Sequence, residues 1–338
     1  MGDRTMKAFV LESYGKKHLL QLTSVSIPEL RDDEVLVKVH AASINVLDSK
    51  IRSGAFKPIL PYTMPLILGH DVAGVVVKVG SQVQQFKLDD EVYARVDDLR
   101  IGTFAEFIPV KEASLAYKPT RLTMEEAAAI PLAALTAWQS LVEKADLKQG
   151  QKIFIQAGSG GVGTFAIQLA KYLGATVATT TSSKNFDLVK GLGADIVIDY
   201  KTQDFEEVLH DYDVILHSQD NKVLKKALRV LKTGGKLISI SGPPDLEFSK
   251  EINAPGVVKM IMRALSSGIR RQAKRLGVTF SFLFMQPNGE QLREIAHLVD
   301  DGKIHPVIDQ VFPFEAINDA LTYVETGHAK GKVVIKVV

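Results

Sequence analysis

The chain has 338 residues, of which 46% are hydrophobic and 24% are charged. These values are ordinary for globular proteins and argue against a disordered or fibrous chain, and the length predicts about two domains at roughly 150 residues each. The 41 Lys and Arg residues and 39 Asp and Glu residues leave a net charge of +2, which predicts no chain-wide attraction for nucleic acid or anionic membranes. The absence of cysteine excludes disulfides, thiolate nucleophiles and cysteine-ligated zinc.

Two stretches have the position or the length of a targeting or membrane segment. Residues 1–7 are polar and match neither a secretory signal nor a myristoylation site. Residues 153–170 are uncharged and long enough for a membrane span, but they include four glycines and several polar side chains. We therefore expect a cytoplasmic protein with no membrane partner.

The first 125 residues contain short runs in which hydrophobic and polar residues alternate. Examples are residues 34–40 and 75–79, and Gly, Pro, Asn and Asp separate such runs. This alternation is typical of strands that bury one face. The region therefore predicts a β-rich domain.

From Gln151 onward, hydrophobic strands alternate with helical stretches, and a helical, Ala-rich link at 123–147 precedes them. Alternation on this scale indicates an α/β fold with a doubly wound parallel sheet. The expected strands are residues 152–157, 175–180, 195–198, 213–216 and 236–240. A helix is expected at 162–172, after the first strand.

Residues 250–277 form an unusually basic stretch, with seven Lys and Arg residues and one acidic residue. Such a stretch can dock to a membrane, an acidic partner or an anionic group of a substrate, or it can be a solvated helical face, which we favour here. Beyond it the sequence predicts a helix at 289–301 and a last strand at 332–338.

The strongest motif is the glycine turn at residues 157–163, Ala-Gly-Ser-Gly-Gly-Val-Gly. It follows a predicted strand and opens a predicted helix, which is the context required of a G-x-G-x-x-G dinucleotide site. Glycines let the backbone approach a pyrophosphate, which then accepts hydrogen bonds at the N-terminus of the helix. The turn therefore predicts binding of a dinucleotide by Ser159, Gly160, Gly161 and Val162.

The next strand indicates which dinucleotide is bound. An NAD site usually places an Asp or Glu about 20 residues after the glycine turn, to bind the ribose 2′-hydroxyl. This chain has Thr, Ser, Lys and Asn at 179–185 and no carboxylate, which favours the 2′-phosphate of NADPH, bound by Ser182 and Lys184. Tyr200, at the tip of the following strand, is a further candidate. Lys184 as a solvated lysine and Tyr200 as a half-buried rim residue are the alternatives.

Together these residues resemble the zinc-independent quinone oxidoreductases of the medium-chain dehydrogenase/reductase superfamily. The resemblance runs nearly end to end and rests on the glycine turn and on residues 41–54, 65–74, 102–107, 127–138 and 327–334. It implies a GroES-like substrate domain at 1–125, completed by 286–338, and a Rossmann dinucleotide-binding domain at 126–285. The active cleft is expected at their junction.

The resemblance also suggests roles for individual residues. Asn45 is expected to face the nicotinamide and the substrate; the alternative is that it caps a turn or helix start. Thr136 is expected to lie near the cofactor; the alternative is that its hydroxyl bonds to its own helix. Tyr62 lies outside the matching blocks and is a candidate proton donor on chemical grounds alone, with water or a packing role as its alternatives. His70 occupies a position that ligates zinc in the zinc-dependent branch, but without cysteines neither zinc site of that branch can be built, so no metal is predicted.

Two departures from the family stand out. Asp89 replaces a usual glycine, and Asp tolerates the left-handed backbone expected there. Residues 217–221, His-Ser-Gln-Asp-Asn, replace a pattern with an aspartate and paired glycines beside the expected nicotinamide pocket.

Without a metal to polarise a plain ketone, the substrate must already be electrophilic. We therefore expect an NADPH-dependent oxidoreductase that transfers hydride to quinones or α,β-unsaturated carbonyls. The alternatives are an enoyl-thioester reductase, whose basic stretch at 259–275 would bind a CoA phosphate, and a non-catalytic NADPH-binding interaction protein. A homodimer is expected, formed through the edge strand at 278–284.

Overall fold

The computed structural model of the chain describes residues 5–252 and 255–338. Residues 1–4 of the polar N-terminal stretch and 253–254 of the basic stretch lie outside the described residues. The chain forms two compact units, Met1–Leu135 with Gln286–Val338 (unit 1) and Thr136–Met285 (unit 2). Among the described helices, none combines the length and hydrophobicity that crossing a membrane requires.

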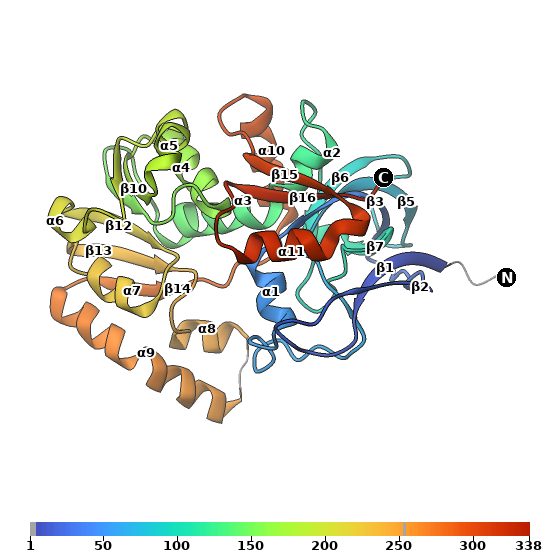
Figure 1. Cartoon of the computed structure of the whole chain (residues 1–338), viewed down its shortest axis with the longest axis horizontal. Coiled ribbons are helices and arrows are strands. Elements are labelled where there is room, and N and C mark those ends of the chain that lie inside the picture. Colours follow the sequence, from blue (N-terminus) through green and yellow to red (C-terminus); the bar gives the residue numbers. More distant parts are fainter. Residues whose placement is uncertain (1–4, 253–254) are drawn as a thin grey trace. The chain divides into compact units, whose positions relative to one another are not determined.

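Unit 1 is built mainly of strands, as Figure 1 shows. Its small sheet has the order β2-β1-β4, and its larger sheet has the order β15-β16-β3-β5-β6-β8, with β7 also paired to β3. The strands are β1 (Thr5–Leu11), β2 (Gln21–Ser26), β3 (Glu34–Ile44), β4 (Leu66–Ile67), β5 (Asp71–Val79), β6 (Glu91–Arg95), β7 (Phe107–Lys111), β8 (Leu115–Tyr117), β15 (Ile308–Pro313) and β16 (Lys332–Lys336).

The helices of unit 1 connect or cap these strands. They are α1 (Val46–Arg52), α2 (Met124–Ala128), α10 (Gly289–Asp300) and α11 (Ile317–Glu325), with 3₁₀ turns at Glu112–Ser114 and Phe314–Ala316. The end of the chain completes the sheet, because β16 pairs antiparallel with β3 and brings Val333 opposite Ile44. This pairing carries Lys332 next to the start of α1.

The core of unit 1 follows from the alternation in its strands. Val35, Val37 and Val39 point to one face of β3 and pack with Val72 and Val76 of β5. Asp89, in the turn before β6, has φ +69°, which confirms the expected left-handed backbone at this position.

Unit 2 contains a parallel sheet with the order β11-β10-β9-β12-β13-β14. The chain order reverses between β9 and β12, which is the switch point at which such sheets bind ligands. The strands are β9 (Lys152–Ile155), β10 (Thr176–Thr181), β11 (Ile196–Asp199), β12 (Tyr212–His217), β13 (Leu231–Ser239) and β14 (Thr279–Phe282).

Helices cover both faces of this sheet. One face packs against α6, α7 and α9 in a core that includes Phe154, Phe205, Leu224 and Ile269, while α4 and α5 lie on the other face (Figure 1). The helical segments are α4 (Gly161–Tyr172), α5 (Phe186–Gly191), α6 (Phe205–Val208), α7 (Asn221–Ala227), α8 (Leu246–Glu251), α9 (Gly256–Leu276), a π-helix (Gln139–Lys144) and a 3₁₀ turn (Ser183–Asn185).

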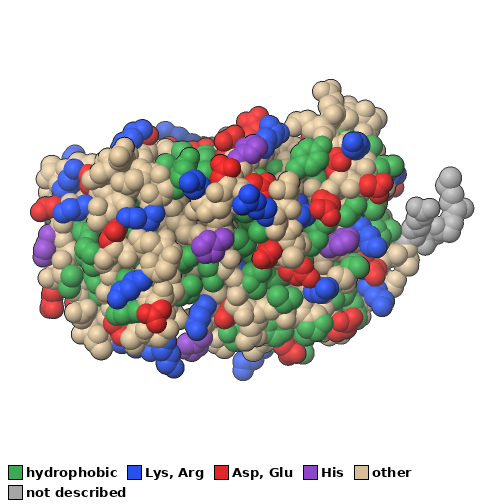
Figure 2. Space-filling model, turned by 90° about the horizontal axis from the view of Figure 1, so that it is seen from above, with side chains coloured by type: hydrophobic (Ala, Val, Ile, Leu, Met, Phe, Trp, Pro, Cys, Tyr) green, Lys and Arg blue, Asp and Glu red, His purple; other side chains and the backbone are tan. Residues whose placement is uncertain are grey.

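The structure confirms the predicted α/β fold, with a GroES-like unit and a Rossmann sheet. The helical link at 123–147 is interrupted, however: α2 ends at Ala128, α3 (Pro131–Trp138) starts at a proline, and the π-helix follows. A helix cannot readily continue through Pro131, because proline lacks the N–H that an interior position donates. On the face shown in Figure 2, acidic and basic side chains are interspersed, in keeping with the small net charge.

Candidate active site and dinucleotide site

The first polar cluster in unit 1 begins where β3 ends and α1 starts. Asn45 is the N-cap of α1, and its backbone N–H donates to Asp48 Oδ2 at 2.7 Å. An acidic side chain three residues after the cap satisfies a backbone donor that the helix itself leaves unpaired. The helix start therefore fixes the Asp48 side chain against the backbone of Asn45.

His70 packs against this helix start. Its Nδ1 lies 2.7 Å from Asp48 Oδ1, and both side chains are fully buried. Because a carboxylate can only accept, His70 donates from Nδ1 in this pair. Its Nε2 is buried with no hydrogen-bond partner among the described residues.

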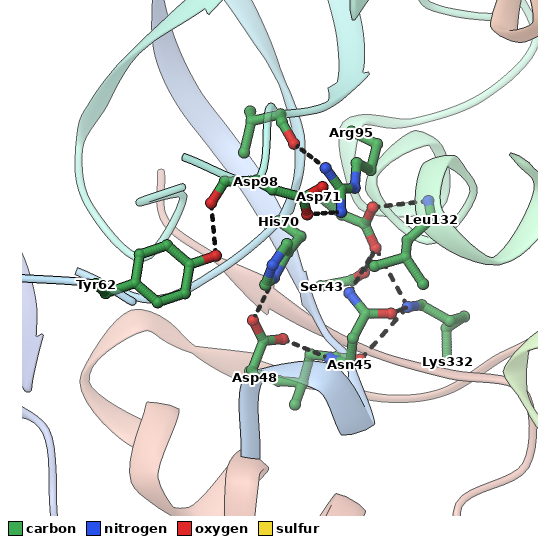
Figure 3. Close-up of polar contacts among 12 residues, drawn as sticks. Ser43, Asn45, Asp48, Tyr62, His70, Asp71, Arg95, Asp98, Leu132 and Lys332 are labelled. Atoms are coloured by element: carbon green, nitrogen blue, oxygen red, sulfur yellow. Dashed lines mark hydrogen bonds and ion pairs between the residues drawn. The ribbon is translucent and has the colours of Figure 1, made fainter. Parts of the chain in front are cut away.

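Asp71 is the centre of the cluster drawn in Figure 3. Its fully buried carboxylate accepts hydrogen bonds from the Ser43 hydroxyl at 2.7 Å, Asn45 Nδ2 at 2.9 Å and the backbone N–H of Leu132 at 2.8 Å. Lys332 Nζ lies 3.3 Å from the same carboxylate. A buried charge needs this number of partners to offset its lost hydration.

Lys332 is an unusual lysine because it is only 4% exposed. Its ammonium donates to Asn45 Oδ1 at 2.5 Å and to the backbone oxygen of Ile44 at 3.4 Å. The Asn45 amide thus has its oxygen toward a cation and its nitrogen toward a carboxylate. Asn45 Nδ2 keeps one hydrogen that these bonds do not use.

Tyr62 lies beside His70 in Figure 3, and its hydroxyl donates to the backbone oxygen of Asp98 at 2.5 Å. Burial raises the pKa of Tyr62 well above its usual value of 10, with the Asp98 carboxylate as a second cause. Arg95, buried next to it, pairs with the Asp98 carboxylate. The phenol therefore stays protonated at neutral pH and already uses its hydrogen.

The second site is the glycine turn of unit 2, at the carboxyl end of β9. A Cβ on Gly158 would lie 2.1 Å from Thr179 Oγ1, and one on Gly163 would lie 2.3 Å from the backbone oxygen of Ala157. These two glycines are thus required by internal packing. A Cβ on Gly160 would meet only Ala157 O at 3.4 Å, so this side of the turn is open to a ligand.

The backbone of the turn is partly committed. The N–H of Gly160 donates to Ala157 O at 3.0 Å and that of Gly158 to Thr180 O at 3.0 Å. Helix α4 begins at Gly161 with Gly160 as its N-cap, so Gly161 and Val162 lie in the first turn, where backbone N–H groups can bind an anion.

Ser159 joins the turn to the end of β10. Its Oγ accepts from Thr181 Oγ1 at 2.8 Å and from Asn185 Nδ2 at 3.1 Å, which leaves its own hydrogen for another acceptor. Asn185 Nδ2 also lies 3.5 Å from Ser182 Oγ. Ser159, Ser182 and Asn185 therefore form one hydroxyl and amide group at this edge of the sheet.

The remaining candidates in unit 2 differ in exposure. Lys184 is exposed in the 3₁₀ turn after β10, and Tyr200 is 61% exposed, with its backbone N–H bonded to Thr181 O at 3.3 Å. Thr136 is buried on α3 in the same unit. The structure brings Ser159 and Ser182 to one cluster with Asn185. Lys184 precedes Asn185 in the same 3₁₀ turn, and Tyr200 is bonded to Thr181, whose hydroxyl donates to Ser159.

The unusual 217–221 segment forms a well-bonded turn. His217 Nε2 lies 3.1 Å from the backbone oxygen of Asp220, so Nε2 donates and Nδ1 accepts from Ser239 Oγ at 2.9 Å. Asp220 caps α7 by accepting from the N–H groups of Lys222 and Val223. Burial lowers the pKa of His217 from 6.5 to about 4, so the ring is neutral and structural.

The polar residues do not fit a zinc site. Within residues 5–252 and 255–338, no group of three or more His, Asp or Glu side chains could hold a metal. His70 offers one free nitrogen, Asp48 and Asp71 are engaged by hydrogen-bond donors, and Lys332 places a positive charge beside Asp71. A zinc ion prefers four N, S or O donors and would meet a cation here.

Two members of the unit 1 cluster were missed from sequence. Lys332 is the first residue of the predicted strand at 332–338, and nothing in the local pattern indicates that its ammonium is buried. Asp71 precedes an apolar run and so begins a buried strand, but no local pattern marks its carboxylate as the centre of a polar cluster. The two residues are 261 positions apart, so only tertiary pairing of β16 with β3 brings them together.

Comparisons with known proteins agree with this architecture. The family model for the alcohol dehydrogenase GroES-like domain matches residues 31–120, and a zinc-binding dehydrogenase model matches residues 192–335. The quinone oxidoreductase from Coxiella burnetii superposes with a TM-score of 0.87 and 31% identity, over 99% of this chain and 100% of that one.

Curated relatives match over nearly the whole chain. The chain is 38% identical to the chloroplastic NADPH-dependent alkenal/one oxidoreductase of Arabidopsis thaliana, over 98% of this chain and 80% of the relative. It is 38% identical to the mitochondrial NAD(P)H oxidoreductase RTN4IP1 of Homo sapiens, over 98% and 89%. The motifs, the two units and these matches together assign the chain to the quinone oxidoreductase family of the medium-chain dehydrogenase/reductase superfamily.

Proposed function

We propose that the protein is an NADPH-dependent reductase that transfers hydride to α,β-unsaturated carbonyls and quinones. The observation that carries the proposal is the glycine turn after β9, joined to hydroxyl and amide groups rather than to a carboxylate at the end of β10. A carboxylate at the end of β10 would repel the 2′-phosphate that distinguishes NADPH from NADH. The Arabidopsis relative is named as an NADPH-dependent alkenal/one oxidoreductase.

The residues proposed for the cofactor divide by role. Ser159, Gly161 and Val162 offer donors to the pyrophosphate, and Gly160 keeps the approach open. Ser182, Lys184 and Tyr200 bind the 2′-phosphate, with Thr136 nearer the nicotinamide. When bound, NADPH supplies a hydride for the conjugated carbon of the substrate.

Asn45 is proposed to stabilise the charge that develops on the substrate oxygen. Its Nδ2 has a free hydrogen, and its partners Asp71 and Lys332 hold the amide in one orientation. A donor that needs no reorganisation at the moment of reaction is worth far more than one in water. Holding the reactants in contact contributes a further ~7–11 kcal/mol at most.

The final proton comes from Tyr62 or from water. The structure favours water, because the Tyr62 hydroxyl donates to Asp98 O and burial raises the pKa of Tyr62. No zinc step is proposed, since the donor set around His70 does not fit the ion. The substrate must therefore be electrophilic without a Lewis acid.

We propose that residues 1–125 and 286–338 form the domain that binds the substrate, and that residues 126–285 form the domain that binds the dinucleotide. A homodimer is proposed through β14, because it is an edge strand of the unit 2 sheet and would otherwise leave unpaired backbone groups. Light scattering of the purified chain tests this assembly, and a monomer would contradict it. A cytoplasmic location is tested by fractionation; several relatives are named as mitochondrial or chloroplastic.

The test of the function is a panel of acceptors with NADPH, followed at the absorbance band of reduced nicotinamide. We expect turnover of alkenals, enones and quinones. Faster turnover of a crotonyl thioester than of any of them would favour an enoyl-thioester reductase instead. Tight NADPH binding with no oxidation by any acceptor would favour a non-catalytic NADPH-binding protein. The residues at 217–221 form a well-bonded turn, so they give no structural support to that interpretation.

A further inference from the structure

Helix α9 uses one narrow stripe to pack on unit 2. Its buried residues are Met262, Ser266, Ile269 and Ala273, spaced by four, three and four positions. This is the spacing of a single helix face, and Ile269 and Ala273 belong to the core beside β13. Of the other residues of this 21-residue helix, twelve are exposed and five are half-buried, namely Val258, Lys259, Ser267, Arg270 and Gln272.

The solvent side of α9 is hydrophobic where a surface helix is normally polar. Val257 is 67% exposed, Met260 66%, Ile261 51% and Leu265 63%. Their spacing of three, one and four positions places them together on a second face of the helix. Exposed apolar groups that gather in this way mark interaction sites.

Basic residues flank this apolar face, and the helix has no acidic residue. They are Lys259, Arg263, Arg270, Arg271, Lys274 and Arg275. Not one of the six forms an ion pair with a carboxylate whose side chain the structure describes. The helix thus carries six positive charges with no ion-paired carboxylate among the described side chains, although the net charge of the whole chain is only +2.

Four of these charges lie away from the dinucleotide site. The glycine turn follows the carboxyl end of β9. Helix α9 ends at Leu276, just before β14, and the backbone oxygen of its C-cap Gly277 accepts from the N–H of Gly234. Because the strands are parallel, Arg270, Arg271, Lys274 and Arg275 lie toward their amino ends, at the opposite edge of the sheet. The proposed reaction therefore does not use them.

We propose that the exposed face of α9 docks on a bilayer surface that contains anionic lipid. Val257, Met260, Ile261 and Leu265 would enter the headgroup boundary, and the Lys and Arg side chains would contact lipid phosphates and carboxylates. Helix α9 combines an exposed apolar face with Lys and Arg and no acidic residue, which is the composition of helices that lie in the interface of an anionic bilayer. Sequence alone predicted no membrane partner, because periodicity did not reveal that two apolar stripes exist and only one is buried.

The test uses the full chain and sedimentation with vesicles, either of phosphatidylcholine alone or of phosphatidylcholine mixed with phosphatidylserine. We expect binding to the mixed vesicles only, weakened by high salt. The triple variant Arg263→Gln, Arg271→Gln, Lys274→Gln should bind at least about tenfold more weakly, because it removes three of the charges that attract anionic lipid. Met260→Ser with Leu265→Ser should also weaken binding.

The matched control removes the same charge elsewhere, by Lys78→Gln, Lys87→Gln and Lys222→Gln, which are exposed positions outside α9. The control should bind the mixed vesicles like the parent, and all variants should keep the NADPH affinity of the parent. Absence of binding by the parent, or an equal loss in the control, would overturn the proposal. Binding to polyglutamate but not to phosphatidylserine vesicles would assign the face to an acidic protein instead.

Discussion

The ammonium of Lys332 donates to the side-chain oxygen of Asn45 at 2.5 Å, although the two residues are 287 positions apart. The same ammonium lies 3.3 Å from Asp71, which accepts from Asn45 Nδ2. One lysine from the last strand thus orients the amide that the proposed reaction uses. Loss of the lysine would leave a buried carboxylate without its cation.

Lys332→Met should therefore destabilise the protein strongly. Removing one partner of a buried pair costs about 3–5 kcal/mol, because the remaining charge stays buried without compensation. Denaturant unfolding of the variant measures this loss. The control is Lys336→Met on the same strand, whose exposed side chain pairs with Glu125 at 3.2 Å and should contribute less than about 1 kcal/mol. Equal losses in the two variants would contradict the assigned role of Lys332.

Asn45→Ala should slow the reaction without weakening the binding of NADPH. Removing one donor to a developing oxyanion typically lowers kcat about 10²–10³-fold. Steady-state turnover of an enone and fluorescence titration with NADPH measure the two effects. Ser43→Ala removes another partner of Asp71 but not the donor, so it should have a much smaller effect on kcat.

Tyr62→Phe should also keep most activity if water supplies the proton; a loss as large as that of Asn45→Ala would identify Tyr62 as the acid.

Lys184→Ala should weaken NADPH binding about tenfold and leave NADH binding nearly unchanged, since only NADPH carries the 2′-phosphate that a charge-assisted hydrogen bond would recognise. Titration of both cofactors against the parent and the variant tests this. Lys190→Ala, another exposed lysine of the same unit, is the control and should affect neither cofactor. Parallel losses for NADPH and NADH would exclude a phosphate-specific role.

The buried His217 predicts a pH dependence of stability. Its pKa is lowered by burial from 6.5 to about 4, so between these pH values the unfolded chain binds a proton that the folded chain does not. The free energy of unfolding therefore decreases as the pH falls from 6.5 to about 4, and His217 contributes about 3 kcal/mol of this decrease. His217→Gln should show a correspondingly smaller fall in unfolding free energy between pH 7 and pH 4, while His210→Gln, at an exposed position, should follow the parent. Identical pH profiles for His217→Gln and the parent would refute this assignment.

Much of the fold follows from local sequence. The alternation in β3 and the strand–turn–helix order around the glycine turn are short-range patterns, and they predicted the two architectures and the start of α4. Lys332 and Asp71 were missed because their burial depends on the pairing of β16 with β3, which no local pattern encodes. The second apolar stripe of α9 was missed for a related reason: the pattern shows an amphipathic helix, but tertiary packing decides which face is covered.

The measurement that tests the central claim most directly compares an α,β-unsaturated ketone with its saturated counterpart, each with NADPH and with NADH, using protein dialysed against a chelator. The account predicts efficient reduction of the unsaturated ketone with NADPH, slower reduction with NADH, and no reduction of the saturated ketone. Equal turnover of the two ketones, or activity that disappears on dialysis and returns with zinc, would contradict it.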